Sequence, residues 1–142
     1  MPRMLIGLAV VWMLALCGYD VRQRRLPNWL TIPGFVVIAA AAAWSGHGLA
    51  ALVGAAALAT VYLMVHVTAP AAMGAGDAKL ALGLGALTAC FGTDVWTMAA
   101  IGAPLLTAVA GIVARIGWSV RTLPHGPAMC SASAAAIGSA ML

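Results

Sequence analysis

The stretch LPNWLTIPGFVVIAAAAAWSGHGLAALVGAAALATVYLMVHVTAPAAMGAG, residues 26–76, contains no aspartate, glutamate, lysine or arginine. A helix that crosses the hydrocarbon core of a bilayer needs about 20 apolar residues, so this stretch is long enough for two such helices. The turn-forming sequence Ser-Gly-His-Gly at residues 45–48 divides it near the middle. The sequence therefore predicts one membrane helix on each side of this turn.

The remainder of the chain has the same character. Of its 142 residues, 64% are hydrophobic and 7% are charged, whereas a soluble domain carries about 25% charged residues. We expect an all-α, polytopic membrane helix bundle that forms a single domain over residues 1–142. We interpret the apolar N-terminal segment as the first helix rather than as a cleaved signal peptide, because several further spans follow. About six transmembrane helices are predicted, at residues 4–19, 29–44, 48–67, 78–91, 95–116 and 127–141.

The basic residues predict the orientation of the bundle. With six helices, the connections after the first, third and fifth helices share one side, and only Arg3 lies on the other. Basic loops face the cytoplasm, so we expect a multi-pass protein of the inner, cytoplasmic membrane with its N-terminus outside. The net charge of +4 then indicates contact with anionic headgroups rather than with nucleic acid. The basic residues on the predicted cytoplasmic side are Arg22, Arg24, Arg25, Lys79, Arg115 and Arg121.

The three cysteines give no sign of a metal or cofactor site. Cys17, Cys90 and Cys130 are far apart in the sequence, and each lies in an apolar run. No paired-cysteine or cysteine–histidine spacing typical of a metal site is present. We therefore expect no metal and no cofactor, and interpret the cysteines as packed small side chains.

The chain has no glutamate and only three aspartates, Asp20, Asp77 and Asp94. The predicted topology places Asp20 and Asp77 on the cytoplasmic side and Asp94 on the other. Two adjacent carboxylates cannot both ionise cheaply, so such a pair shares a proton and can activate water. Simpler roles remain open: Asp20 as a solvated carboxylate beside Arg22 or Arg24, and Asp77 and Asp94 as helix N-caps.

The sequences around the two cytoplasmic aspartates resemble the motifs of the type IV prepilin peptidases, a family of membrane aspartyl endopeptidases. GAGDAK at residues 74–79 is similar to that family's GxGDxK motif, and DVRQRRLPN at residues 20–28 resembles its first aspartate motif. A weaker likeness is the Gly-Pro step in PHGP, residues 124–127. The order and spacing of these motifs extend the resemblance over nearly the whole chain.

The resemblance implies that Asp20 and Asp77 are catalytic and that the substrate is a prepilin-like protein with a basic leader before a hydrophobic helix. Gly74, Gly76 and Lys79 would shape the site, although Lys79 is equally an ordinary interfacial lysine. Longer family members carry a paired-cysteine segment associated with N-methylation. The sequence leaves no room for that segment after Arg25, so the resemblance is to the short form that serves tight-adherence (Tad) pili.

In the first motif, Pro27 suits the start of the second helix and Asn28 is a candidate cap. His47 and His66 are expected to be packed or interfacial, whereas a substrate contact remains open for His125. The rival function is a non-catalytic membrane subunit, either a small transporter or channel component or a scaffold for pilus assembly. The oligomeric state is left open by the sequence.

Overall fold

The computed structural model describes residues 2–71, 73–118 and 124–142, with side chains from residue 6 onward. Within these residues the chain forms six α-helices and no strand, which confirms the predicted all-helical membrane bundle. The helices are α1 (Pro2–Gln23), α2 (Asn28–Trp44), α3 (Gly48–Thr68), α4 (Ala75–Ala89), α5 (Thr93–Trp118) and α6 (Gly126–Met141).

Two helix boundaries differ from the prediction in a way that matters for the site. The first helix continues to Gln23 and ends where Arg24 adopts a φ of 51° and donates its amide to the Asp20 carbonyl at 2.9 Å. The fourth helix begins at Ala75, three residues earlier than predicted. Glycine is a poor helix interior residue but suits the start of a helix. Both aspartates consequently lie within helical turns rather than in the flanking loops.

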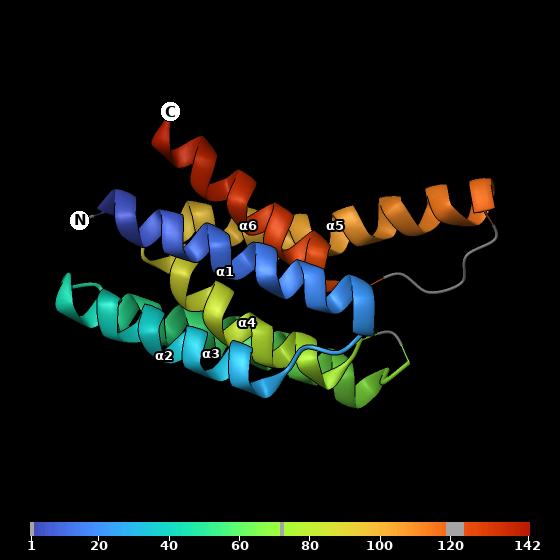
Figure 1. The fold of residues 1–142 in the computed structure, drawn as a ribbon, viewed down its shortest axis with the longest axis horizontal. Coiled ribbons are helices and arrows are strands. Elements are labelled where there is room, and N and C mark those ends of the chain that lie inside the picture. The colour runs from blue at the N-terminus through green and yellow to red at the C-terminus, as the bar shows by residue number, and fades with distance from the viewer. Residues whose placement is uncertain (1, 72, 119–123) are drawn as a thin grey trace.

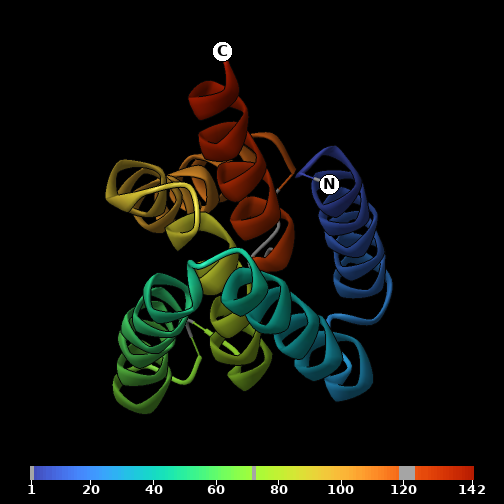
Figure 2. The ribbon, with the colours of Figure 1, turned by 90° about the vertical axis from the view of Figure 1, so that its left-hand side faces the viewer.

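Successive helices run in opposite directions, so the connections gather at two ends of the bundle (Figure 1). One end holds the last turns of α1, α3 and α5, and the other holds both termini. Seen along the bundle, α4 lies among the other helices (Figure 2), and it packs against α2, α3, α5 and α6. The buried residues of α4 are mostly small or aliphatic, among them Leu80, Ala81 and Leu84. This central helix therefore carries much of the core.

Small residues let α3 and α4 approach closely. A Cβ atom added to Gly85 would lie 2.6 Å from the Gly54 carbonyl oxygen and 3.1 Å from the Ala55 Cα. The indole of Trp96 donates to the same Gly54 carbonyl at 3.1 Å. In a bilayer, helices associate through such close packing because lipid offers no hydrophobic gain for their contact. The two glycines thus set the separation of α3 and α4.

The outer surface is apolar, as expected of a protein in contact with lipid. Exposed side chains include Val11, Leu52 and Leu105, which are 63%, 55% and 58% accessible. In the part of the chain that the structure describes, three helices are long and apolar enough to cross a membrane, α1, α3 and α5, and α2 is a shorter apolar helix. The full number of spans and the outside N-terminus remain predictions, and Arg121 lies outside the described residues.

The contact between α3 and α4 gives a testable prediction. Substituting Gly85→Ala places a methyl group against the backbone of α3, which cannot rotate away, and such overpacking costs about 1–3 kcal/mol. We expect a lower thermal unfolding temperature in detergent than for the unmodified protein. Gly111→Ala on α5 is the control, because nothing lies within 4 Å of its added Cβ. Equal unfolding temperatures for the two variants would contradict this packing.

Candidate functional site

The carboxylate of Asp20 is held by the first turn of a distant helix. Asp20 lies in the last turn of α1 and is only 6% accessible. The backbone amide of Gly126, the first residue of α6, donates to Asp20 Oδ2 at 2.9 Å. A helix N-terminus carries unpaired amides and the positive end of the helix dipole, so it stabilises a carboxylate. The expected alternative of a solvated carboxylate is therefore wrong.

Only glycine fits at position 126. A Cβ atom there would lie 2.5 Å from Asp20 Oδ2 and 3.0 Å from its Cγ, well inside ordinary contact. Pro127 follows in the first turn of α6, where its missing amide costs no helical hydrogen bond. In the sequence, this Gly-Pro step was notable only as a weak likeness to a family motif. It did not indicate that the Gly126 amide binds Asp20, because 106 residues separate the two groups.

Asp77 also binds a backbone amide at the start of a helix, in this case its own helix, α4. It lies in the first turn of that helix and is 9% accessible. Gly74 is the residue at the N-cap position, and its amide donates to Asp77 Oδ2 at 3.3 Å. The alternative role of Asp77 as the N-cap itself is wrong, because its carboxylate reaches back from inside the helix. Each of the two carboxylates thus accepts a hydrogen bond from one backbone amide at the start of a helix.

The two aspartates are close enough to interact. Burial, and next the negative charge of Asp20, raise the pKa of Asp77 to about 6, while the Gly74 amide acts in the opposite direction. Near neutral pH, Asp77 can therefore gain or lose a proton, and the charge of Asp20 favours its protonated form. This is the electrostatic arrangement in which two acids share a proton.

The remaining motif residues join the two sequence segments. Lys79 Nζ donates to the Asn28 side-chain oxygen at 2.8 Å, which links α4 to the start of α2. Asn28 is inside α2 and Pro27 precedes it, without a side-chain cap, so the predicted capping role of Asn28 is wrong. Gly76 allows close packing, because a Cβ there would lie 3.2 Å from the Leu26 Cβ. These contacts hold the connection after α1 against the first turn of α4.

His125 is an internal residue rather than an open substrate contact. It is 9% accessible and precedes Gly126 at the start of α6. Its ring nitrogens contact Thr107 Oγ1 on α5 and Tyr62 Oη on α3, the latter at 3.2 Å. His66, for which packing was expected, contacts the Met73 carbonyl with its Nδ1 at 2.7 Å, just before Gly74. Sequence reasoning missed the three-helix contact of His125, because its partners are 18 and 63 residues away.

Asp94 stands apart from this cluster. It is exposed and lies in the first turn of α5, which begins at Thr93, so it is not the N-cap residue that the sequence suggested. The start of α5 is at the end of the bundle that holds the termini, away from α1's last turn (Figure 1). Within residues 2–71, 73–118 and 124–142, no group of three or more His, Cys, Asp or Glu side chains is placed to hold a metal ion.

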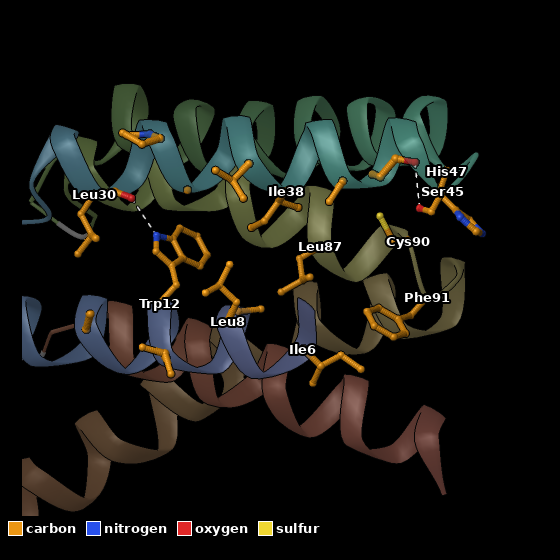
Figure 3. Close-up of a pocket in the computed structure, with 18 of the residues that line it drawn as sticks. Ile6, Leu8, Trp12, Leu30, Ile38, Ser45, His47, Leu87, Cys90 and Phe91 are labelled. Carbon is orange, nitrogen blue, oxygen red and sulfur yellow. Dashed lines mark hydrogen bonds between the residues drawn. The ribbon is translucent and has the colours of Figure 1, made fainter. Parts of the chain in front are cut away.

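An apolar cleft of about 660 Å³ opens between α1 and α2. Figure 3 shows Leu8 and Trp12 of α1 facing Ile38 of α2 across it, with Leu87 of α4 behind. The Trp12 indole donates to the Leu30 carbonyl at 2.8 Å and so bridges the cleft near its end at residues 29–30. That end adjoins Asn28, the partner of Lys79. The cleft therefore begins beside the two aspartate-bearing segments.

Comparison with known families matches residues 7–120 to the type IV leader peptidase family. The matched segment includes Asp20, Asp77 and Lys79, and it ends before α6. Searches of curated proteins and of solved structures found no significant match.

The interaction of the two carboxylates can be measured by labelling. The protein holds only three aspartates, so carboxyl-¹³C aspartate gives three signals to titrate in micelles. Asp20→Asn removes the charge that helps to raise the pKa of Asp77, so that pKa should fall from about 6 but stay above the ordinary aspartate value, because burial is the larger cause. Asp94→Asn should leave it unchanged. If the pKa of Asp77 were the same in Asp20→Asn as in the unmodified protein, the two carboxylates would not interact.

Proposed function

The chain belongs to the type IV leader peptidase family, and on that premise we propose that it is an aspartyl endopeptidase. Asp20 and Asp77 would be the catalytic pair, cleaving prepilin-like proteins after their basic leader at the cytoplasmic membrane face. The observation that carries the proposal is the pair of interacting, buried carboxylates, each bound by one backbone amide. No other aspartate of the chain lies at that end of the bundle.

The proposed reaction needs one proton on the pair. The ionised carboxylate removes a proton from water, and the protonated partner donates a hydrogen bond to the scissile carbonyl oxygen. Attack by water then forms a tetrahedral intermediate, and proton transfer to the leaving nitrogen completes cleavage. The pKa of about 6 for Asp77 keeps the singly protonated pair accessible near neutral pH. In a pair that shares one proton the apparent pKa values belong to the pair, so neither carboxylate is assigned as base or acid.

The motif residues support this site in distinct ways. Gly74 supplies the amide that binds Asp77, and Gly76 leaves room for Leu26. Lys79 and Asn28 would keep the two aspartate-bearing segments together through their hydrogen bond. Pro27 directs the chain into α2 with φ −70° and ψ 136°. In this proposal these residues shape the site and do not take part in proton transfer.

The connection between α1 and α2 consists of residues 24–27 only. It has no room for the paired-cysteine segment of the longer family members, so we do not extend the proposal to methyl transfer. The proposed substrate is a pilin of the Tad type, in keeping with the short form. We further propose that the enzyme is a multi-pass protein of the inner membrane and that Arg22, Arg24 and Arg25 meet anionic headgroups.

The cleft between α1 and α2 is the proposed entry for the hydrophobic helix of the substrate. It is lined almost wholly by apolar side chains, and one end adjoins the connection that follows Asp20. A substrate helix in this cleft would place its cytoplasmic end, where the leader is cut, beside the carboxylate pair. Trp12 would contact the helix near that end, because its indole bridges the cleft to Leu30.

Replacing either carboxylate should abolish cleavage. In membranes that contain a prepilin, Asp20→Asn and Asp77→Asn should each lower the rate of leader removal by about 10³-fold or more, because residues that act as one unit fail together. The readout is the mobility shift of the pilin on immunoblots, with enzyme amounts matched.

Asp94→Asn is the matched control and should cleave normally, since Asp94 is exposed at the other end of the bundle. Normal leader removal by either of the first two variants would reject the peptidase assignment of this pair and favour the non-catalytic subunit.

The entry site is testable by photo-crosslinking. A photoreactive amino acid at Val37, which lines the cleft and is 51% accessible, should crosslink to the hydrophobic helix of a co-expressed prepilin. The control is Leu105 on α5, which is 58% accessible but does not line the cleft. Equal yields at the two positions would mean that the substrate helix does not use this cleft.

A further inference from the structure

The hydrogen bonds around His125 fit a neutral ring with its proton on Nδ1. The Thr107 hydroxyl donates to the Ala103 carbonyl at 3.0 Å, within α5. A hydroxyl has one proton to donate, so toward His125 the Thr107 oxygen acts as an acceptor. With the Thr107 proton assigned to the Ala103 carbonyl, Nδ1 of His125 is the donor toward Thr107.

The other ring nitrogen then acts as an acceptor. Burial lowers the pKa of His125 below its usual range, which favours the neutral ring. In a neutral ring with a proton on Nδ1, Nε2 has a free lone pair, and it accepts the Tyr62 hydroxyl proton at 3.2 Å. The result is one continuous network of hydrogen bonds, which runs from the Tyr62 hydroxyl through His125 and Thr107 to the Ala103 carbonyl.

This network of hydrogen bonds lies next to the residue that binds Asp20. His125 directly precedes Gly126 in the sequence, and the Gly126 amide donates a hydrogen bond to Asp20 at 2.9 Å. At the other end, Tyr62 of α3 is buried, with 4% of its surface accessible. The imidazole thus connects the first turn of α6 to α3 and α5.

We propose that His125 is a positioning residue of this peptidase: by binding Tyr62 and Thr107 it fixes the first turn of α6, so that the Gly126 amide stays on Asp20. The inference rests on the proposed function for its catalytic consequence, but its structural part does not. His125 makes no contact with substrate in this account. It acts through Gly126 and Tyr62.

The kinetic test removes one hydrogen bond at a time with nearly isosteric substitutions. Tyr62→Phe and Thr107→Val should each lower kcat roughly fivefold with KM unchanged, since one hydrogen bond is worth about 1 kcal/mol and a tenfold change in rate corresponds to about 1.4 kcal/mol. In a His125→Ala background the same two substitutions should have no further effect, because the shared partner is gone.

Thr60→Val is the matched control. The Thr60 hydroxyl donates to the Ala56 carbonyl at 2.6 Å, as Thr107 does to Ala103, but Thr60 is exposed on α3. This variant should keep the wild-type kcat. The proposal would be overturned if Thr107→Val and Tyr62→Phe had the same kcat as Thr60→Val. It would also be overturned if they changed only KM, or if their effects on kcat added fully to that of His125→Ala.

A second readout does not need catalysis. The sequence contains only two His-Gly steps, His47-Gly48 and His125-Gly126, so carbonyl-¹³C histidine with ¹⁵N glycine marks two amides. Asp20→Asn should move the Gly126 signal and thereby identify it. Thr107→Val and Tyr62→Phe should also move it, while the Gly48 signal at the opposite end stays as an internal reference. A Gly126 signal that these variants leave in place would overturn the proposal, even if the wild-type protein cleaves no prepilin. Absence of wild-type cleavage would reject the proposed function alone.

Discussion

The hydrogen bond from the Gly126 amide to the buried carboxylate of Asp20 is the contact on which the arrangement of the site depends. It brings together the end of α1 and the start of α6, two helices at opposite ends of the sequence. It also gives a buried anion the partner it requires, because an unpaired charge in a poorly solvated environment is costly. The Gly74 amide provides a similar but longer contact for Asp77. Both acids are thereby held at one end of the bundle.

Close packing of small residues makes this arrangement possible. Leu80 and Leu84 of α4 are almost fully buried at the centre, and Gly85 lets α3 approach the same helix. The polar groups at the end of the bundle that holds Asp20 and Asp77 are then fixed by a rigid scaffold, while the cleft between α1 and α2 leaves one side accessible from the membrane. The structure thus combines a well-supported carboxylate pair with an open apolar approach to it.

Hydrophobic runs and turn residues were sufficient to predict six helices, and the alternation of those helices placed Asp20 and Asp77 together. The exact ends of the helices were predicted less well from the sequence. Asn28 has the side chain of a cap, yet its oxygen accepts from Lys79 on another helix. Similarly, the contacts of Gly126 and His125 join residues from distant helices, and no local pattern specifies such partners. Their roles follow only when the packing of α6 against α1 and α5 is known.

The most direct test of a shared proton on Asp20 and Asp77 is the pH dependence of kcat/KM for prepilin cleavage in proteoliposomes. If the singly protonated pair is the active form, activity should fall with unit slope as the pH rises above the upper apparent pKa of the pair. Since the pKa of Asp77 is raised to about 6, that decline should begin near this value. An activity that stays constant from pH 5 to pH 8, with substrate binding and enzyme stability unchanged, would contradict the shared-proton account.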